Sequence, residues 1–251
     1  MDLKDKIGWS HRLGIALVFA TALLYFIHYL IFHDLHHIFI YMIGDVAFLP
    51  IEVLFVSLII HRLLSEREKR IRLEKLNMVV GAFFSEVGTK MLAYFSDMDP
   101  YLEMIQKDLV VQNEWCDGDF TCVKQKLSGY DYSVDMEKID LKAIRKLLLD
   151  NRRFFLRLLE NPNLLEHESF TDLLMAVFHL TEELQHREQL KGLPEADVDH
   201  ITGDIQRVYS RLVMHWLDYM HHLKDNYPFL FSLAMRTNPF DQEASAIITG
   251  D

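Results

Sequence analysis

The stretch that decides the fold is Ile38–Ile60, IFIYMIGDVAFLPIEVLFVSLII. A helix of about 20 apolar residues crosses a bilayer, and this stretch is long and apolar enough to do so. Three residues interrupt its apolar character, namely Asp45, Pro50 and Glu52. The two acids are seven residues apart, so a helix places them on one face, roughly 10 Å apart along its axis. A charge near the bilayer centre costs on the order of 3 kcal/mol, so such acids indicate function or assembly.

A first apolar run, about residues 13–32, precedes this stretch and predicts another membrane span. Its polar or small positions Gly14, Thr21 and His28 are spaced by seven, which predicts one face for close packing or polar contact with the partner span. The linker between the runs is HDLHH at 33–37, and so short a linker predicts an antiparallel hairpin. We interpret the first run as a retained span, because the second span, about 38–60, follows at once.

Basic residues gather at one end of the expected hairpin, and the HDLHH turn has no Lys or Arg. Cytoplasmic flanks of membrane spans carry an excess of Lys and Arg, so the sequence predicts a two-span inner-membrane protein with both termini cytoplasmic. The basic residues concerned are Lys4, Lys6 and Arg12 before the spans, and Arg62, Arg67, Lys69, Arg70 and Arg72 after them.

The rest of the chain has helical periodicity and no alternating pattern typical of strands. We expect an all-α protein: a transmembrane hairpin (1–62), a long juxtamembrane helix (63–98) that loosens near Gly81 or Gly88, a cytoplasmic helical-bundle domain (99–240) and a polar tail (241–251). The helices expected after residue 98 are Tyr101–Gln112, Phe120–Leu127, Leu141–Glu160, Phe170–Arg187, Glu195–Lys224 and Phe229–Arg236.

The charge balance excludes one class of partner. Residues 76–251 carry 17 basic and 29 acidic side chains, which leaves them at −12. Nucleic-acid binding needs a basic surface, so we expect no nucleic acid partner. The chain contains no Walker, dinucleotide-binding, G-x-S-x-G or HExxH motif, so the sequence favours a protein that is not an enzyme, and the stripe of His179, Glu183 and His186 leaves a metalloenzyme open.

The acids of the second span indicate a cation pathway. Pro50 has no N–H, so the carbonyl of Val46 loses its usual helical partner and becomes available to water or a cation. Two spans cannot enclose a pathway, so this interpretation requires a homo-oligomer in which rings of Asp45 and Glu52 select cations. In the alternative interpretation Asp45 pairs with His28 or a neighbouring chain, Glu52 is protonated, and both acids only hold helices together.

Two histidine groups are candidate metal ligands. The turn residues His33, Asp34, His36 and His37 would concentrate divalent ions such as zinc, or sense external pH. Otherwise they form an ordinary polar turn at the membrane interface.

In the helix expected at Phe170–Arg187, the side chains of His179, Glu183 and His186 share a face, with the Glu-x-x-His spacing of di-iron bundles. A second helix would have to complete such a site, and its candidates are His215, Asp218 and His222. The apolar face of the first helix lies opposite, so this stripe is solvated unless another helix or subunit covers it. No cofactor is firmly implied, and a divalent metal ion stays open.

Three stretches carry a resemblance: residues 43–88 from IGDVAFLPIE to FFSEVG, residues 160–184 (ENPNLLEHESFTDLLMAVFHLTEEL) and residues 226–240 (NYPFLFSLAMRTNPF). Together they resemble a group of uncharacterised two-span prokaryotic membrane proteins. The resemblance covers most of the chain and implies two spans followed by a helical domain. It implies no activity.

Two functions are consistent with these observations. The first is an oligomeric inner-membrane cation channel or transport component, whose cytoplasmic domain regulates or assembles it. The alternative is a membrane-anchored helical signalling or scaffold module that binds a cytoplasmic protein partner. The expected partners are therefore the lipid bilayer, further copies of the chain and, in the alternative, that protein.

Overall fold

The computed structural model describes residues 3–162, 164 and 167–247, and over these residues it contains helices and no strand. The expected all-α fold class is confirmed. The chain divides into two compact units, Met1–Glu68 and Lys69–Asp251. We call the first unit the hairpin and the second the helical domain, and we describe each by itself.

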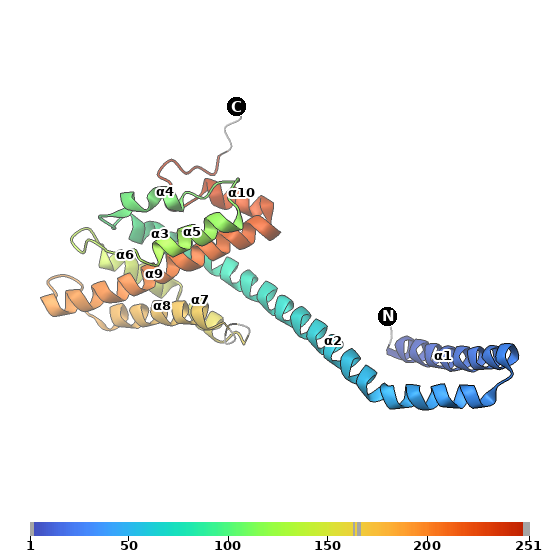
Figure 1. Cartoon of the computed structure of the whole chain (residues 1–251). Helices are drawn as coiled ribbons and strands as arrows, with labels where there is room; N and C mark the ends of the chain where they lie inside the picture. The colour runs from blue at the N-terminus through green and yellow to red at the C-terminus, as the bar shows by residue number, and fades with distance from the viewer. Residues whose placement is uncertain (1–2, 163, 165–166, 248–251) are drawn as a thin grey trace. The chain divides into compact units, whose positions relative to one another are not determined.

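The hairpin contains α1 (Leu3–Phe32) and the first part of α2 (Leu35–Phe83), which lie side by side and antiparallel (Figure 1). The connection is only His33 and Asp34, because α2 begins three residues earlier than the sequence predicted. His33 adopts a φ of 51°, and its N–H donates to the carbonyl of Tyr29 at 2.9 Å, which ends α1 with a left-handed residue. Asp34 then caps α2 by accepting the N–H groups of His36 and His37.

Both hairpin helices are long and apolar enough to cross a membrane, with a mean hydropathy of 2.2 in their most apolar windows. Length and composition establish this much, and a core helix or a signal sequence shares both properties. None of either window is buried within the chain. Across residues 11–71 every side chain is exposed except those of His28 and Ile38, which are half-buried.

The helical domain is built around one long helix, α9 (Glu195–Asn226), against which α3, α5, α8 and α10 pack (Figure 1). The other helices are η1 (a π-helix, Phe84–Gly88), α3 (Thr89–Ser96), η2 (a 3₁₀-helix, Leu102–Met104), α4 (Gln106–Leu109), α5 (Asp117–Leu127), α6 (Leu141–Asp150), α7 (Arg152–Leu159), α8 (Glu168–His186) and α10 (Pro228–Arg236). The buried side chains of α9 recur every three or four residues, which is the spacing of one helix face.

The long helix after the second span loosens where the sequence predicted, at a π-helical turn. Phe83 and Phe84 are both fully buried beside this turn. A Cβ atom added to Gly88 would lie 2.7 Å from the ring of Phe84 and 2.8 Å from that of Phe83. Only glycine therefore fits there, because the two rings occupy the space of a side chain.

Two helix predictions were wrong. The expected helix Tyr101–Gln112 is two short helices, η2 and α4, with a break at Ile105, whose φ is −119°. The expected helix Leu141–Glu160 is divided into α6 and α7 at Asn151, whose side chain donates to the carbonyl of Leu147 at 2.8 Å. An asparagine side chain that hydrogen-bonds to a nearby backbone carbonyl competes with the backbone hydrogen bonds that would continue the helix.

Candidate functional site

The hairpin contains a pocket of about 400 Å³ between α1 and α2. Polar and apolar side chains from both helices line it. The lining residues are Thr21, Leu24, Tyr25, His28, Ile38, Tyr41 and Asp45. Asp45 of α2 thus lines the same pocket as Thr21 and His28 of α1.

His28 is the most enclosed polar residue of the hairpin. Its ring stacks on that of His37, with centroids 6.1 Å apart and planes 5° apart, and it also contacts Phe32. Its Nδ1 atom is buried and has no hydrogen-bond partner within the described part of the chain. The Thr21 hydroxyl, in contrast, donates to the carbonyl of Leu17 at 3.0 Å. An unpaired buried nitrogen costs free energy, so His28 needs a further polar neighbour, such as water or another chain.

The pocket fixes the register of the two antiparallel helices. Thr21 and Asp45 line it together, and seven residues further towards the turn His28 and Ile38 line it as well. Gly14 lies seven residues before Thr21, and Glu52 lies seven residues after Asp45, so each shares a helix face with a residue that lines the pocket. A Cβ atom added to Gly14 would meet nothing within 4 Å, so open space remains beside this residue.

α2 is one continuous helix through Pro50. Glu52 is exposed within the chain and lies outside the pocket of Asp45. We call five positions the polar column: His28, Thr21 and Asp45 line the pocket, and Gly14 and Glu52 share the helix faces of Thr21 and Asp45 by their spacing of seven residues.

The HDLHH turn uses its acid as a helix cap. One oxygen of Asp34 accepts the N–H of His36 at 2.9 Å and that of His37 at 3.2 Å. The His37 ring packs edge-on against Tyr41. Within the described residues, His33, Asp34, His36 and His37 do not form a group of converging ligand atoms. Metal binding or pH sensing by this turn stays a prediction.

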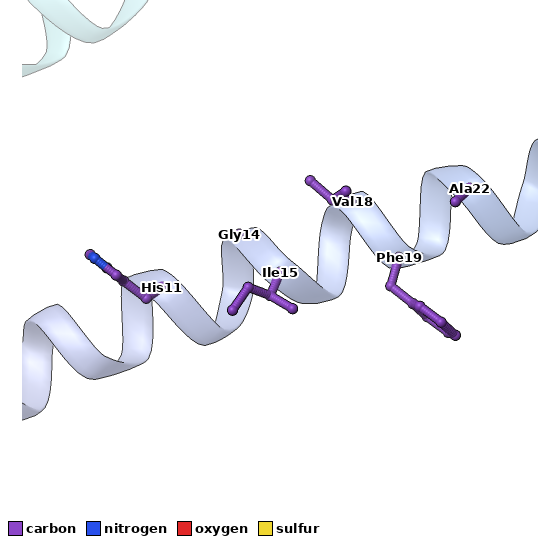
Figure 2. A pocket seen from close by; sticks show the side chains of 6 residues that line it. All are labelled: His11, Gly14, Ile15, Val18, Phe19 and Ala22. Atoms are coloured by element: carbon purple, nitrogen blue, oxygen red, sulfur yellow. The ribbon is translucent and has the colours of Figure 1, made fainter.

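A second hollow, of about 600 Å³, lies on a flank of α1 (Figure 2). Its lining residues all belong to that helix: His11, Gly14, Ile15, Val18, Phe19 and Ala22. The hollow is open because Gly14 and Ala22 leave little side chain along this flank. Small residues at such spacing let a neighbouring helix approach closely in a membrane.

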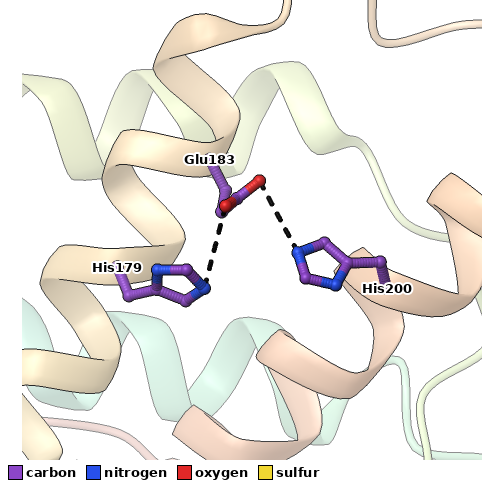
Figure 3. Close-up of side chains that lie close together, drawn as sticks. All are labelled: His179, Glu183 and His200. Atoms are coloured by element: carbon purple, nitrogen blue, oxygen red, sulfur yellow. Dashed lines mark ion pairs between the residues drawn. The ribbon is translucent and has the colours of Figure 1, made fainter.

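The helical domain brings His179 and Glu183 of α8 against His200 of α9 (Figure 3). Glu183 lies between the two imidazoles: its Oε1 is 3.8 Å from His179 Nε2 and its Oε2 is 3.7 Å from His200 Nε2. Asp204, one turn after His200, is only 2% exposed, and its Oδ2 lies 3.2 Å from His179 Nε2 and 3.6 Å from His200 Nε2. We call these four residues the α8–α9 cluster.

Arginines hold both carboxylates of the α8–α9 cluster. Arg187 donates to Glu183 Oε2 and to Asp197, each at 2.6 Å. The hydrogen bond from Arg187 lowers the pKa of Glu183, and the same guanidinium lowers the pKa of Asp197. Arg207 donates to Asp204 Oδ1. Asp204 therefore binds Arg207 through Oδ1 and turns Oδ2 towards both imidazoles, whereas Glu183 turns Oε1 towards His179 and shares Oε2 between Arg187 and His200.

The structure combines these residues differently from the sequence prediction. His186 lies apart from His179 and Glu183, and its Nδ1 is 2.8 Å from the carbonyl of Glu182. The candidates expected on the second helix have other neighbours: His215 contacts the Ser169 carbonyl, Asp218 pairs with Lys124, and His222 contacts Asn77.

Sequence reasoning missed His200 and Asp204. His200 and Asp204 are four residues apart in α9, and His179 and Glu183 are four residues apart in α8. That shared spacing is the signal that was available in the sequence.

A second group of ligand atoms is more open to solvent. His221 Nε2 lies 3.0 Å from Asp117 Oδ1 and 3.6 Å from Asp225 Oδ2. The side chain of Asp117 is 89% exposed and that of Asp225 is 56% exposed. Exposed ion pairs of this kind contribute little to stability and have no enclosed ligand.

Comparison with known proteins identifies relatives along nearly the whole chain. Residues 72–236 match a family described as uncharacterized protein MJ1433, C-terminal helical domain, and residues 4–64 match MJ1433, N-terminal helical domain. The uncharacterized protein MJ1433 of Methanocaldococcus jannaschii is 50% identical over 239 residues, which covers 95% of this chain and 96% of the relative. No solved structure matches the chain. The expected resemblance to an uncharacterised group with helical domains is confirmed.

Proposed function

Because the chain belongs to the MJ1433 family, whose description specifies two helical domains and no activity, we propose a function from the geometry of the chain itself. We propose an oligomeric component of the inner (cytoplasmic) membrane that passes cations along the polar column of the hairpin. The helical domain would regulate or assemble it.

The exposed apolar surface of the hairpin supports a bilayer as its partner. Nearly every side chain from residue 11 to residue 71 is exposed within the chain, and large apolar residues dominate α1 and the first part of α2. Apolar surface left in water costs about 25 cal/mol per Å², so a hairpin this exposed would be strongly unfavourable in water. A bilayer covers that surface without any further protein.

The basic residues after the second span support the proposed orientation. Arg62, Arg67 and Lys69 follow the apolar part of α2, and the turn at His33 and Asp34 has no Lys or Arg. Membrane proteins carry an excess of basic residues on the cytoplasmic side, which supports both termini in the cytoplasm and the turn outside.

The polar column is the observation that carries the cation proposal. Asp45 lines the pocket beside Thr21 and His28 of α1, and Glu52 shares a face of α2 with Asp45 by its spacing of seven residues. Acids that faced lipid would be expensive to ionise, whereas acids in a hydrated column keep their charge and attract cations.

A single hairpin cannot surround a pathway, so the proposal requires several copies. The flank of α1 that carries the hollow beside Gly14 and Ala22 would receive a helix of the next copy. The acids of all copies would then form rings around an axis, and the unpaired Nδ1 of His28 would gain water or a neighbouring polar group.

Flux through liposomes tests this proposal. The purified full chain is reconstituted, and K⁺ and Mn²⁺ entry is followed with trapped fluorescent indicators. We expect wild-type flux, and a loss of about tenfold or more in Glu52→Gln and in Asp45→Asn, because each removes a ring of charge. Glu66→Gln, an acid beyond the apolar stretch, is the matched control and keeps its flux. Equal flux in all four proteins, or none in the wild type, contradicts the proposal.

One observation favours the second candidate, a membrane-anchored scaffold. In the helical domain α10 exposes Phe229, Leu230 and Leu233, and a groove of about 350 Å³ beside it reaches Trp216. A protein partner would cover such apolar side chains. Crosslinking in native membranes separates the candidates: a ladder of copies of the chain supports the channel, and a single heterologous product supports the scaffold.

A further inference from the structure

The α8–α9 cluster contains a buried carboxylate oxygen without a partner. Asp204 Oδ2 has no hydrogen bond within the described residues, although the side chain is 2% exposed. His179 Nε2 is only 3.2 Å away, so the distance would permit a hydrogen bond, but the N–H direction of the ring does not point at the oxygen. A close but misaligned pair is expected when both atoms point towards a third position between them.

The arginines orient both carboxylates for such a position. Arg187 holds Glu183 through Oε2, and Arg207 holds Asp204 through Oδ1. The remaining oxygens, Glu183 Oε1 and Asp204 Oδ2, are the ones nearest to His179 Nε2. Partners that bond one oxygen of a carboxylate and leave the other for a ligand are typical of the outer shell of metal sites.

From these contacts we infer that His179, Glu183, His200 and Asp204 bind one transition-metal ion, Zn²⁺ by preference. The site is independent of the proposed cation pathway, because all four residues belong to the helical domain.

The ligand separations fit a small tetrahedral ion. Zinc binds nitrogen and carboxylate oxygen at about 2.0–2.2 Å, so neighbouring ligand atoms in a tetrahedron lie roughly 3.3–3.5 Å apart. The four histidine–carboxylate separations in the cluster run from 3.2 to 3.8 Å, and the one between Glu183 and His200 involves Oε2, the oxygen that Arg187 also binds. The ligand atoms of His179, Glu183 and His200 also lie within 4.8 Å of one another.

The donor set selects the class of metal. Two imidazoles with two carboxylates suit Zn²⁺ and its transition-metal neighbours, whereas Mg²⁺ and Ca²⁺ prefer oxygen ligands and Cu⁺ prefers sulfur. Four protein ligands form a closed site, and closed four-ligand zinc sites are structural.

The position of the cluster shows what the metal does for the fold. Two ligands come from α8 and two from the beginning of α9, so the ion links the helices across the turn that contains Gly192. The side chains of His179 and His200 are 47% and 51% exposed, which leaves a path for the ion from solvent. Asp204 provides the buried ligand beneath them.

Metal titration of the full chain in detergent tests the inference. The chelator-treated protein is titrated with Co²⁺, whose visible absorption reports tetrahedral coordination, and Zn²⁺ then displaces it. We expect tetrahedral Co²⁺ at one site per chain and displacement by one equivalent of Zn²⁺. The double variant His179→Gln/His200→Gln should lose this absorption and weaken zinc binding by about 100-fold or more, while Asp204→Asn should weaken it by about 10–100-fold.

Two histidines serve as matched controls. His186→Gln removes a histidine of α8 that lies apart from the cluster, and His221→Gln removes the histidine of the other, exposed group. Both should bind Zn²⁺ within about twofold of wild type. Asp204 is buried and paired with Arg207, so its variant is judged only if circular dichroism shows intact helices.

The double variant provides the decisive test, because it replaces two half-exposed histidines. Unchanged Co²⁺ absorption in His179→Gln/His200→Gln, no tetrahedral absorption in the wild type, or an equal loss in His186→Gln overturns the inference. Cation flux plays no part in this readout, so the channel proposal can fail without affecting it.

Discussion

The hairpin and the helical domain are both made of apolar-rich helices, yet large apolar side chains are exposed in the hairpin and buried in the helical domain. Phe19 of the hairpin is 69% exposed, whereas Phe84 of the helical domain is fully buried. Helix formation is common to both, and only the surroundings differ. The difference teaches that the helical domain is stabilised by its own core, while the hairpin depends on something outside the chain, which we propose to be lipid.

The polar side chains of the two regions also differ, in whether they have hydrogen-bond or ion-pair partners. In the helical domain, Glu183, Asp197 and Asp204 each accept from an arginine. In the hairpin, His28 Nδ1 has no partner, and Asp45 makes no hydrogen bond or ion pair within the described part of the chain. We interpret the hairpin as the region that meets water, ions or other copies through its polar side. The buried polar side chains described in the helical domain are hydrogen-bonded except at Asp204 Oδ2 and the Tyr209 hydroxyl.

The largest expected effect comes from shortening a phenylalanine in each region. Phe84→Ala should destabilise the helical domain by about 3–5 kcal/mol, because it leaves a cavity in a close-packed core. Phe19→Ala removes the same atoms from an exposed position of the hairpin and should leave that stability unchanged. Denaturant titration of the detergent-solubilised chain, followed by the fluorescence of buried Trp216, measures both. Equal losses of unfolding free energy in Phe84→Ala and Phe19→Ala would contradict the proposed difference between the two regions.

A smaller effect is expected from acid, through His215. Burial lowers the pKa of His215 to about 4, with the charges of His167, Lys124 and Arg211 acting in the same direction. The unfolded chain binds this proton near pH 6.5, so the stabilisation is fully present above that pH. It is lost as the pH falls towards 4, by at most about 3 kcal/mol.

In the variant His215→Gln, the stability of the helical domain should change less between pH 6.5 and pH 4 than it does in the wild type. The hairpin variant His36→Gln, which changes an exposed residue, should keep the wild-type slope. Stability curves at several pH values provide the measurement. A slope that survives in His215→Gln assigns the acid sensitivity to other groups.

The smallest expected effects come from replacing single glycines of the two regions by alanine. Gly88→Ala should cost about 1–3 kcal/mol, because the new methyl group overlaps the rings of Phe83 and Phe84. A methyl group at Gly14 of the hairpin meets nothing within 4 Å, so Gly14→Ala should leave the helical domain unaffected. Gly203→Ala, in open space within α9, should stabilise the domain by about 0.5–1 kcal/mol. A loss in Gly203→Ala as large as that in Gly88→Ala would show that crowding is not the cause.

Much of the fold could be predicted because period and hydropathy are local properties. The two apolar runs, the helical period of the rest and the loosening near Gly88 all depend on neighbours along the chain. The start of α2 was placed too late because the cap provided by Asp34 makes His36 and His37 part of the helix. The division at Asn151 was missed because a single side chain bond to Leu147 competes with a strong helical pattern.

The α8–α9 cluster could be predicted only in part. His179 and Glu183 share a face by spacing alone, whereas their pairing with His200 depends on how α9 returns along α8. The turn at Gly192, with a φ of 69°, contributes to that register, and no spacing rule yields it. His186 was included because it follows Glu183 by three residues, but its ring contacts the backbone of its own helix.

The polar column of the hairpin is the central claim, and cysteine accessibility tests it most directly. In a background with Cys116→Ser and Cys122→Ser, single cysteines replace Asp45 and Glu52 on the proposed hydrated side. Matched cysteines replace Ile43 and Leu54, which lie on the opposite side of α2 by helical spacing. Membrane vesicles are treated with a small, membrane-impermeant, thiolate-selective reagent.

Only a thiol that meets water ionises and reacts, so the reagent reports hydration. We predict rapid modification at 45 and 52, slowed by added cations, and little reaction at 43 and 54. Equal protection at all four positions, or faster reaction at 43 and 54, would contradict the account.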